Sequence, residues 1–255
     1  MKSKNFELED DLRFKYHHPA PDLSKVSNPT DFYLEISKDL LQSFEEYVKA
    51  NDFLDVFYTN LNDDFKKTFK TSFNSVILLI FPISKDIIKL PPSKDKIKLM
   101  DDEFQDIGFK LYNCSDFLRS NGFRTEVINP LDDKINLKKL AIGSNHSVII
   151  RSNICYFKKG INMSIFGIFT SINNFPIKKE NDMLWIKEYC SNCGACINKC
   201  PEDAFDENEQ LIPKLCTAHR EGCNECILNC IFFKKDYETI KERYNKKLRR
   251  TNNKV

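Results

Sequence analysis

Apolar residues recur at the spacing of one helix face in two segments of the chain. In residues 31–50 they are Phe32, Ile36, Leu40, Phe44 and Tyr47. Residues 102–121 follow the same period, and Gly122 directly after them suits a helix stop. We therefore predict two amphipathic helices, 31–50 and 102–121, each with an apolar side that packs on another layer.

Shorter runs of apolar and β-branched residues predict strands. The most continuous is "FNSVILLIFPIS", residues 73–84, and the two prolines of "KLPPSKDK" predict a loop after it. The other strand candidates are residues 123–129, 147–152, 155–160 and 161–172, with Gly160 in the turn between the last two. Residues 131–142 are a short helix candidate. This order predicts an α+β fold, in which helices pack on an N-terminal sheet.

The end of the chain differs in composition from this sheet region. "NNFPIKKENDM", residues 173–183, is the predicted linker, so we divide the chain into a sheet domain (1–177), a cysteine-rich module (178–235) and a basic tail (236–255). Residues 234–255 hold nine Lys or Arg and three acidic residues, a net charge of +6. Such a tail can contact RNA phosphates. The alternative, which we favour, is a solubilising and partly helical end.

Overall composition sets wider limits. The chain has 255 residues, 41% of them hydrophobic, which suffices for one large or two unequal domains with a substantial core. The net charge of +2 identifies no partner. The longest apolar run, residues 76–83, is too short to span a bilayer, and the first residues lack the apolar core of a secretory signal. We therefore expect a cytoplasmic protein without a membrane partner.

Eight of the ten cysteines lie between Cys190 and Cys230. The first four, followed by Pro201, have the spacing C-x2-C-x2-C-x3-C-P of bacterial ferredoxins, which bind [4Fe–4S] clusters; they are Cys190, Cys193, Cys196 and Cys200. Pro201 suits the first turn of a helix, where a missing N–H is tolerated. Gly194 leaves room for the backbone to approach cluster sulfide.

A second run supplies ligands for a second cluster, as C-x6-C-x2-C-x3-C: Cys216, Cys223, Cys226 and Cys230. Ile231 stands where the first run has proline. In the ferredoxin pattern the fourth cysteine of a run binds the other cluster. Cluster one would then take Cys190, Cys193, Cys196 and Cys230, and cluster two would take Cys200, Cys216, Cys223 and Cys226. Such a module would depend on metal for folding.

Other interpretations of the cysteines stay open. Structural zinc is one alternative, although two C-x2-C pairs at zinc spacing are not evident. One cluster with spare thiols is another. His219 could replace a thiolate, but we expect an exposed loop residue there. For the isolated Cys114 and Cys155, we predict small buried hydrophobic side chains.

Taken together, these parts resemble the epoxyqueuosine reductase family and its relatives, the reductive dehalogenases. The similarity spans roughly residues 70–235 and rests on the cysteine runs, on "FNSVILLIFPIS", on "FQDIGFKLYNCSDFLRSNGFRTEVINP" and on "GSNHSVIIRSNICYFKKGINMSIFGIFTS". The resemblance implies a bacterial-ferredoxin-like double [4Fe–4S] module after a sheet domain that binds a corrinoid, which is the group that reduces the substrate. In epoxyqueuosine reductase that substrate is a modified base in tRNA.

Two departures bear on the corrinoid. The family has a glycine-rich loop against the corrinoid, whereas only one of those glycines is retained here; the resemblance leaves Gly143, Asn145, His146 and Ser147 to line the cofactor site. The family's Asp proton donor corresponds to Asn129, which cannot release a proton as a carboxylic acid does. The nearby acids, Asp132 and Asp133, are more simply explained as solvated loop residues. No catalytic residue is therefore assigned.

Three functions follow from these observations. The first is an oxidoreductase whose clusters relay electrons to a site in the sheet domain, with a corrinoid as the doubtful further cofactor. Its partners would be an electron donor such as a ferredoxin or flavodoxin and a tRNA or small-molecule substrate. The second is an electron-transfer protein whose sheet domain docks a partner, which the glycine-poor loop 141–147 favours. The third is a non-redox protein in which clusters only stabilise the fold.

Overall fold

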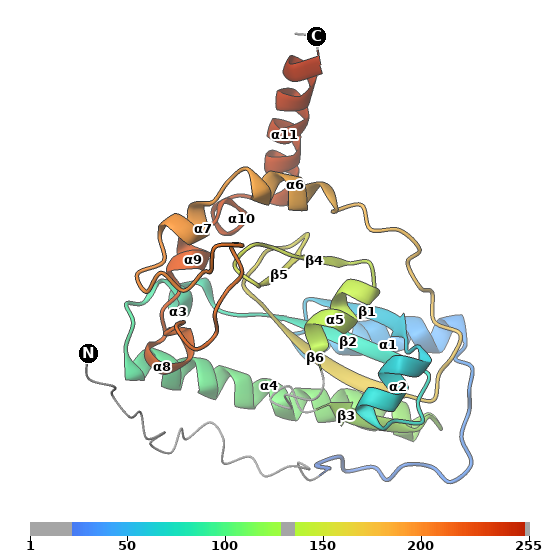
Figure 1. The fold of residues 1–255 in the computed structure, drawn as a ribbon. Coiled ribbons are helices and arrows are strands. Elements are labelled where there is room, and N and C mark those ends of the chain that lie inside the picture. The colour runs from blue at the N-terminus through green and yellow to red at the C-terminus, as the bar shows by residue number, and fades with distance from the viewer. Residues whose placement is uncertain (1–21, 129–135, 253–255) are drawn as a thin grey trace.

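A four-stranded antiparallel sheet forms the centre of the protein in the computed structural model, which describes residues 22–128 and 136–252 (Figure 1). The strand order is β1-β2-β6-β3. Their bounds are β1 Asp55–Asn60, β2 Ser75–Pro82, β3 Thr125–Ile128 and β6 Met163–Thr170. The two central strands pair along their whole length, from Ser75 opposite Thr170 to Pro82 opposite Met163.

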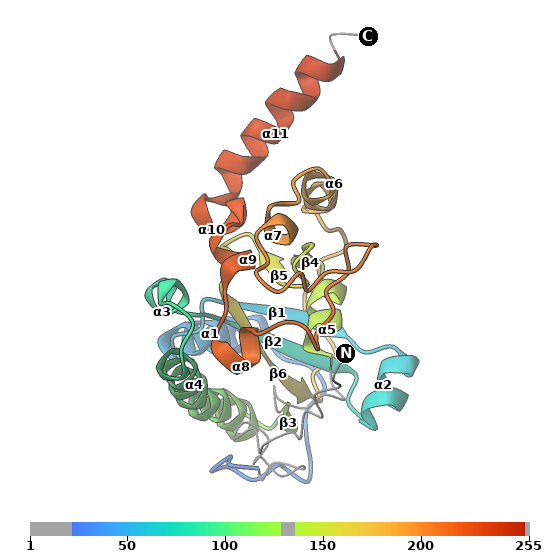
Figure 2. The ribbon, with the colours of Figure 1, turned by 60° about the vertical axis from the view of Figure 1, so that its left-hand side comes forward.

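Two helices, α1 (Lys38–Ala50) and α4 (Lys94–Ser120), cover one face of this sheet (Figure 2). Alternate residues of β2 point to this face, among them Ile77 and Leu79, and they pack on Phe44 of α1 and Leu111 of α4. This alternation is the period of a strand with both faces buried. The predicted amphipathic helices thus bury their apolar sides against the sheet.

The opposite face of the sheet carries α2 (Asp63–Phe69), α5 (Leu137–Gly143) and a two-stranded hairpin. The hairpin pairs β4 (Ser147–Ile149) with β5 (Cys155–Phe157). An added Cβ at Gly167 of β6 would lie 2.7 Å from Ile128 Cδ1 and 3.0 Å from Leu137 Cδ2. Glycine at this position therefore lets α5 approach the sheet closely.

Helix boundaries follow the capping residues more closely than the apolar period. The helix predicted over 31–50 begins only at Lys38, because Ser37 is an extended N-cap whose side chain accepts from Leu40 N. The helix predicted over 102–121 begins earlier, at Lys94, where Ser93 is the N-cap. Gly122, at φ +84°, follows the end of α4 as predicted.

The strand predictions over 73–84, 123–129, 147–152, 155–160 and 161–172 are confirmed as β2, β3, β4, β5 and β6, with shorter bounds, while residue 129 lies outside the described residues. Gly160, at φ +141°, lies in the turn before β6. The helix predicted over 131–142 is present as α5 from Leu137, while residues 131–135 lie outside the described residues. The sequence prediction missed β1, α2 and the short α3 (Lys85–Lys89).

The remaining helices form the C-terminal part of the molecule. They are α6 Trp185–Ser191, α7 Ala195–Asn198, α8 Ala218–Glu221, α9 Glu225–Leu228, α10 Ile231–Lys234 and α11 Tyr237–Asn252. The hairpin connects this part to the sheet: Cys155 and Phe157 face the sheet, whereas Val148, Ile150 and Tyr156 pack against residues of α6, α10 and α11. Its two faces thus belong to two different apolar cores.

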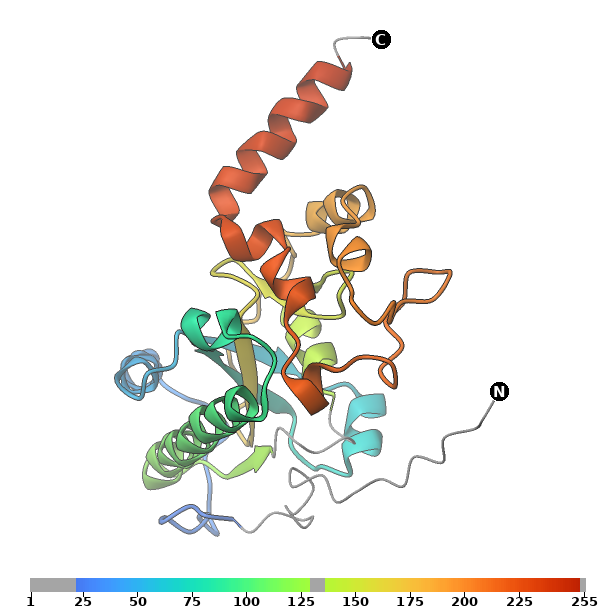
Figure 3. The ribbon, with the colours of Figure 1, turned by 90° about the vertical axis from the view of Figure 1, so that its left-hand side faces the viewer.

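The basic end of the chain forms the helix α11, which extends away from the rest of the molecule (Figure 3). Its first turn is anchored: Tyr237 and Ile240 are buried against Tyr156 and its neighbours. Among the described residues, no helix combines the length and the apolar character needed to cross a bilayer.

Candidate iron–sulfur site

The first cysteine run forms a compact turn between two short helices. Cys190 lies in the last turn of α6, and Cys193 N donates to the Cys190 carbonyl at 3.1 Å. Gly194 then takes a left-handed conformation (φ +63°) as the N-cap of α7. A side chain at Gly194 would be strained, so this glycine lets the chain turn back and place Cys196 near Cys190.

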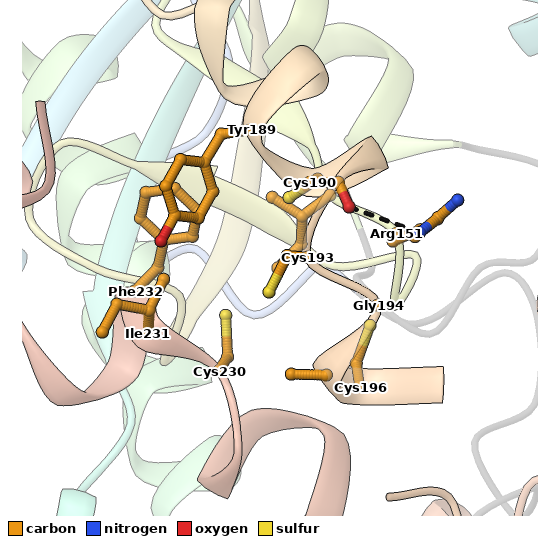
Figure 4. A pocket seen from close by; sticks show the side chains of 11 residues that line it. Arg151, Tyr189, Cys190, Cys193, Gly194, Cys196, Cys230, Ile231 and Phe232 are labelled. Carbon is orange, nitrogen blue, oxygen red and sulfur yellow. Dashed lines mark hydrogen bonds between the residues drawn. The ribbon is translucent and has the colours of Figure 1, made fainter. Parts of the chain in front are cut away.

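Four thiols from both cysteine runs line one cavity: Cys190, Cys193, Cys196 and Cys230 (Figure 4). Cys230 comes from the second run and precedes α10. Tyr189 and Phe232 add aromatic walls to the cavity. The chemistry of this donor set fits a [4Fe–4S] cluster, which is held by four cysteine thiolates.

The second set of cysteines lies beside the first. Burial, followed by the charges of Cys216, Cys196 and Cys223, raises the pKa of the Cys226 thiol to about 12. The α7 and α9 helices also pack together. Cys200, the fourth predicted ligand of cluster two, follows α7, and its sulfur accepts from Ala204 N at 3.4 Å. Of the four predicted ligands of cluster two, Cys216, Cys223 and Cys226 are thus close enough for the charge of one to affect the pKa of another.

Burial is the largest influence on the pKa of two cavity thiols, Cys190 and Cys230. It raises the pKa of Cys190 to about 11 and that of Cys230 to about 12, and the neighbouring cysteines add to both effects. These thiols therefore hold their protons at neutral pH in the free protein. Metal ligands must be thiolates, so loading the site releases protons.

Single metal ions require a tighter arrangement than these cysteines have. Within residues 22–128 and 136–252, no three His, Cys, Asp or Glu side chains are arranged to hold one ion. The four cavity thiols instead line a common space (Figure 4). His219 lies in α8, and its side chain is outside the described part of the structure.

Arg151 is a residue of this site that the sequence analysis missed. It follows the hairpin strand β4, and its Nη1 donates to the carbonyls of Cys190 (3.4 Å) and Ser191 (3.2 Å). It also forms an ion pair with Glu209. The only signal in the sequence was a cation at the end of the apolar run "SVII".

A second and larger cavity adjoins the cavity that Cys190, Cys193, Cys196 and Cys230 line, which we call the cluster cavity. It has a volume of about 320 Å³ and shares Ile150, Arg151 and Cys190 with the first. Its other lining residues are Ile149 and Asn153 from the hairpin region, and Lys187, Ser191, Gln210 and Leu211 from the cysteine-rich part. Residues of both halves of the chain therefore enclose it, directly beside a predicted cluster ligand.

The residues predicted to line a corrinoid site lie together at the end of α5 and the start of β4. Gly143 is exposed and Ser147 is buried. The Asn145 amide donates to the carbonyls of Lys178 (2.8 Å) and Lys179 (3.2 Å), and the His146 ring stacks on Phe57 with centroids 4.1 Å apart.

Two of these four residues, Asn145 and His146, are thus engaged in contacts within the protein, whereas the buried Ser147 hydroxyl has no hydrogen-bond partner among the described residues. None of the four lines either cavity described above. The two engaged side chains would have to leave their present partners to face a corrinoid. Their cofactor role stays a prediction. Asn129, Asp132 and Asp133 lie outside the described residues.

The isolated cysteines behave as predicted. The Cys114 side chain is 0% exposed and that of Cys155 is 4% exposed. Burial raises the pKa of Cys114 to about 12 and that of Cys155 to about 11. Both are neutral members of the apolar cores on the two sheet faces.

Comparisons with known proteins agree with this architecture. Residues 183–206 match the family model described as 4Fe-4S binding domain. No curated protein matches the chain. Among solved structures, epoxyqueuosine reductase from Bacillus subtilis aligns over 78% of this chain and 67% of its own, with a TM-score of 0.56 and 15% identity.

Two further structures extend the comparison. Epoxyqueuosine reductase with an epoxyqueuosine-modified tRNA stem loop aligns with a TM-score of 0.54 and 13% identity, over 78% of this chain and 67% of that one. A catabolic reductive dehalogenase in complex with 3-bromo-4-hydroxybenzoic acid gives a TM-score of 0.65 at 10% identity, over 84% of this chain. The present chain spans only 34% of that dehalogenase.

These identities establish a shared fold and no more. The predicted resemblance is confirmed at that level, and so is the predicted fold class. The chain has the fold of the epoxyqueuosine reductases and reductive dehalogenases, and it carries a 4Fe-4S binding segment of the ferredoxin type at residues 183–206.

Proposed function

We propose that this protein is an iron–sulfur oxidoreductase in which two [4Fe–4S] clusters relay electrons to an acceptor held against the sheet domain. The observation that carries the proposal is the cavity that Cys230 shares with Cys190, Cys193 and Cys196. It supports the crossed ligand set, with Cys200, Cys216, Cys223 and Cys226 for cluster two. A cluster of this type transfers single electrons, and bond chemistry takes place on the acceptor.

The cavity of about 320 Å³ is the proposed acceptor site. Its volume is at the lower end of the range for small-molecule sites, roughly 300–1,000 Å³. Cys190 lines both cavities, so an electron has only one ligand to cross from cluster one. Lys187 makes an anionic small molecule the favoured acceptor class, since it carries a positive charge at the cavity, whereas the charge of Arg151 is offset by Glu209.

A corrinoid acceptor is the finer version of this proposal, and it follows from the fold relatives. When bound, a corrinoid would supply a cobalt centre that reduces the substrate. Gly143, Asn145, His146 and Ser147 would be its predicted contacts. Because Asn145 and His146 are engaged elsewhere, we derive no step through this group.

The second candidate is an electron-transfer protein whose acceptor is another protein. The contacts of Asn145 with the linker favour it, because they give the corrinoid loop a structural role. In both candidates a ferredoxin or flavodoxin is the proposed electron donor. A tRNA substrate belongs only to the corrinoid version.

Iron content and spectroscopy of anaerobically purified protein test the ligand assignment. We expect about eight irons per chain, as two [4Fe–4S] clusters require. Cys230→Ala should disrupt cluster one, although Cys230 belongs to the second run. Cys155→Ala is the matched control, because this thiol is buried in the apolar core between the hairpin and the sheet, and it should keep all iron. Full iron retention in Cys230→Ala, or zinc in place of iron, would overturn the assignment.

A separate binding experiment distinguishes the acceptor classes. The anaerobic protein is incubated with hydroxocobalamin, desalted and examined by absorption spectroscopy. Retained corrinoid absorbance that His146→Ala abolishes would support the corrinoid version. Iron–sulfur absorbance alone would leave the small-molecule and protein acceptors. A Lys187→Met variant that reduces small anionic acceptors at the wild-type rate would then contradict the proposed acceptor cavity.

A further inference from the structure

A lysine from the sheet domain is buried beside the second set of cysteines. Lys96 lies in the first turn of α4, and its side chain is 1% exposed. Lysine is almost never fully buried unless its charge is compensated. The position therefore requires an explanation beyond packing.

The ammonium group of Lys96 points at backbone and amide oxygens. Nζ donates to the carbonyls of Ile88 (2.9 Å) and Leu90 (2.7 Å). Asn224, with its amide turned so that both ends find partners, accepts from Nζ at 3.1 Å and donates to the Cys223 carbonyl at 2.9 Å. These three acceptors are uncharged, so they satisfy hydrogen bonds without neutralising the cation.

The cysteine loop can supply negative charge next to this lysine. Asn224, which accepts from Lys96 Nζ, lies between Cys223 and Glu225 in the sequence and is hydrogen-bonded to the Cys223 carbonyl. When Cys223 binds a cluster, the thiolate is permanent and the whole cluster carries net negative charge. The charge that compensates a buried Lys96 would then be the cluster itself.

The loop backbone also fits closely over this lysine. An added Cβ at Gly222 (φ +73°) would lie 3.3 Å from Lys96 Cδ, and α4 packs against α8. Asn224 is also buried, and its amide is hydrogen-bonded both to Lys96 Nζ and to the backbone carbonyl of Cys223. Lys96 is thus held between the sheet domain and the segment that carries a cluster ligand.

We propose that Lys96 is an electrostatic positioning residue for cluster two, which raises the reduction potential of that cluster and seats its loop on the sheet domain. The inference rests on the proposed function, since it requires the clusters to be present. Reduction adds one negative charge to a cluster, so a nearby buried cation stabilises the reduced state more than the oxidised state. Lys96 Nζ bonds to Ile88, Leu90 and Asn224, and of these only Asn224 adjoins a proposed cluster ligand, which is Cys223 of cluster two. The midpoint of cluster one should therefore shift less, because the Coulomb interaction weakens with distance.

An anaerobic redox titration followed by electron paramagnetic resonance tests this, on the full chain with its clusters. Lys96→Met keeps the length of the side chain and removes the charge. We expect the reduction equilibrium of one cluster to weaken about tenfold, which is about 59 mV for one electron. The Cys226→Ser variant, which perturbs the same signal, identifies it as cluster two. Lys98→Met, an exposed change on the same helix, should leave both midpoints unchanged.

The outcomes separate the inference from the proposed function. Absence of iron in the wild-type protein would refute the proposed function. Two intact clusters with unchanged midpoints in Lys96→Met would overturn only the inference.

If Lys96→Met fails to retain iron, Lys96→Arg decides, because it keeps the charge but changes the shape. Retained iron with a midpoint near that of the wild type supports a requirement for charge. Loss of iron in both variants shows a packing role alone and overturns the proposal.

Discussion

The sheet domain and the cysteine segment from Cys190 to Cys230 are built on different principles. The sheet is buried on both faces, and residues such as Leu79 and Phe166 are fully enclosed. Between Cys190 and Cys230, by contrast, the buried residues among those described are Ala204, Thr217, Gly222 and Asn224. The helices α7, α8, α9 and α10 have four residues each. Burial of apolar surface stabilises the first region, whereas we expect the second to depend on metal for its stability.

The hairpin β4–β5 lies between these two regions and takes part in both cores. Tyr156 is the clearest case, since its ring lies 4.5 Å from that of Phe232 next to the cluster cavity, while Phe157 beside it faces the sheet. We therefore expect that a change in the sheet domain or in the cysteine segment destabilises only that region. A change in the hairpin should destabilise both.

Removal of iron should produce the largest effect. Anaerobic chelation after oxidation should abolish amide protection between Cys190 and Cys230, because few apolar contacts remain there to hold the short helices. Protection in β2 and β6 should persist. Hydrogen exchange read by mass spectrometry measures both at once, and reconstitution with iron and sulfide is the control. Protection that survives iron removal in the cysteine segment would show that this segment folds without metal.

Truncation of a side chain in the sheet core should destabilise the sheet and leave the cysteine segment unchanged. Phe166→Ala removes a fully buried ring that packs on Phe104 (5.0 Å) and Phe53 (6.1 Å), and it should lower the free energy of unfolding of the sheet by about 4 kcal/mol. Iron content should not change. Phe109→Ala, at an exposed position, is the matched control and should stay within about 0.5 kcal/mol of wild type. Denaturant titration provides the measurement.

Replacement of Tyr156 should couple the two regions. Tyr156→Ala leaves a cavity between the hairpin and α10, and we expect a loss of about 3 kcal/mol. Unlike Phe166→Ala, it should also accelerate iron release, monitored by absorbance during unfolding. Tyr156→Phe retains the ring and serves as control. An unchanged rate of iron release in Tyr156→Ala would mean that the hairpin does not transmit stability to the cluster cavity.

The smallest expected effect is a pH dependence at His146. Burial, followed by the positive charge of Lys178, lowers the pKa of His146 below its ordinary value of 6.5. The unfolded chain therefore takes up this proton first as pH falls, and stability declines from about pH 6.5 down through the lower folded pKa. Above that window the effect vanishes. His146→Phe, which can still stack on Phe57, should flatten this decline in melting temperature between pH 7 and 5. An equal decline in the variant would rule His146 out as its source.

The sequence was most informative where one pattern dominates a segment. The run "SVILLIF" predicted β2 because both faces of that strand are buried. β1 was missed because "DVFYTN" is a short edge strand with polar ends, and its strand conformation depends on pairing with β2. The start of α1 was placed too early, since Ser37 caps the helix while the apolar period continues through Ile36 into the sheet core.

Some residues of the candidate site were likewise predicted from the sequence, and others were missed. The cysteine spacing led to the grouping of Cys230 with the first run, which the shared cavity supports. Arg151 and Lys96 were not found, because their roles depend on distant partners. In "SKDKIKLM" Lys96 looks like any solvated charge. Its burial follows from the packing of α4 on α8, which the structure shows and the local sequence does not.

The participation of Cys230 in the cavity of Cys190 also has a consequence for biosynthesis. A ribosome that has made the whole first run has not yet produced the last wall of this cavity. Until translation passes Cys230, the chain holds three of the four thiols of this cavity, Cys190, Cys193 and Cys196. Delivery of iron and sulfide for the proposed cluster would therefore follow the synthesis of Cys230, by which time every strand of the four-stranded sheet has been made.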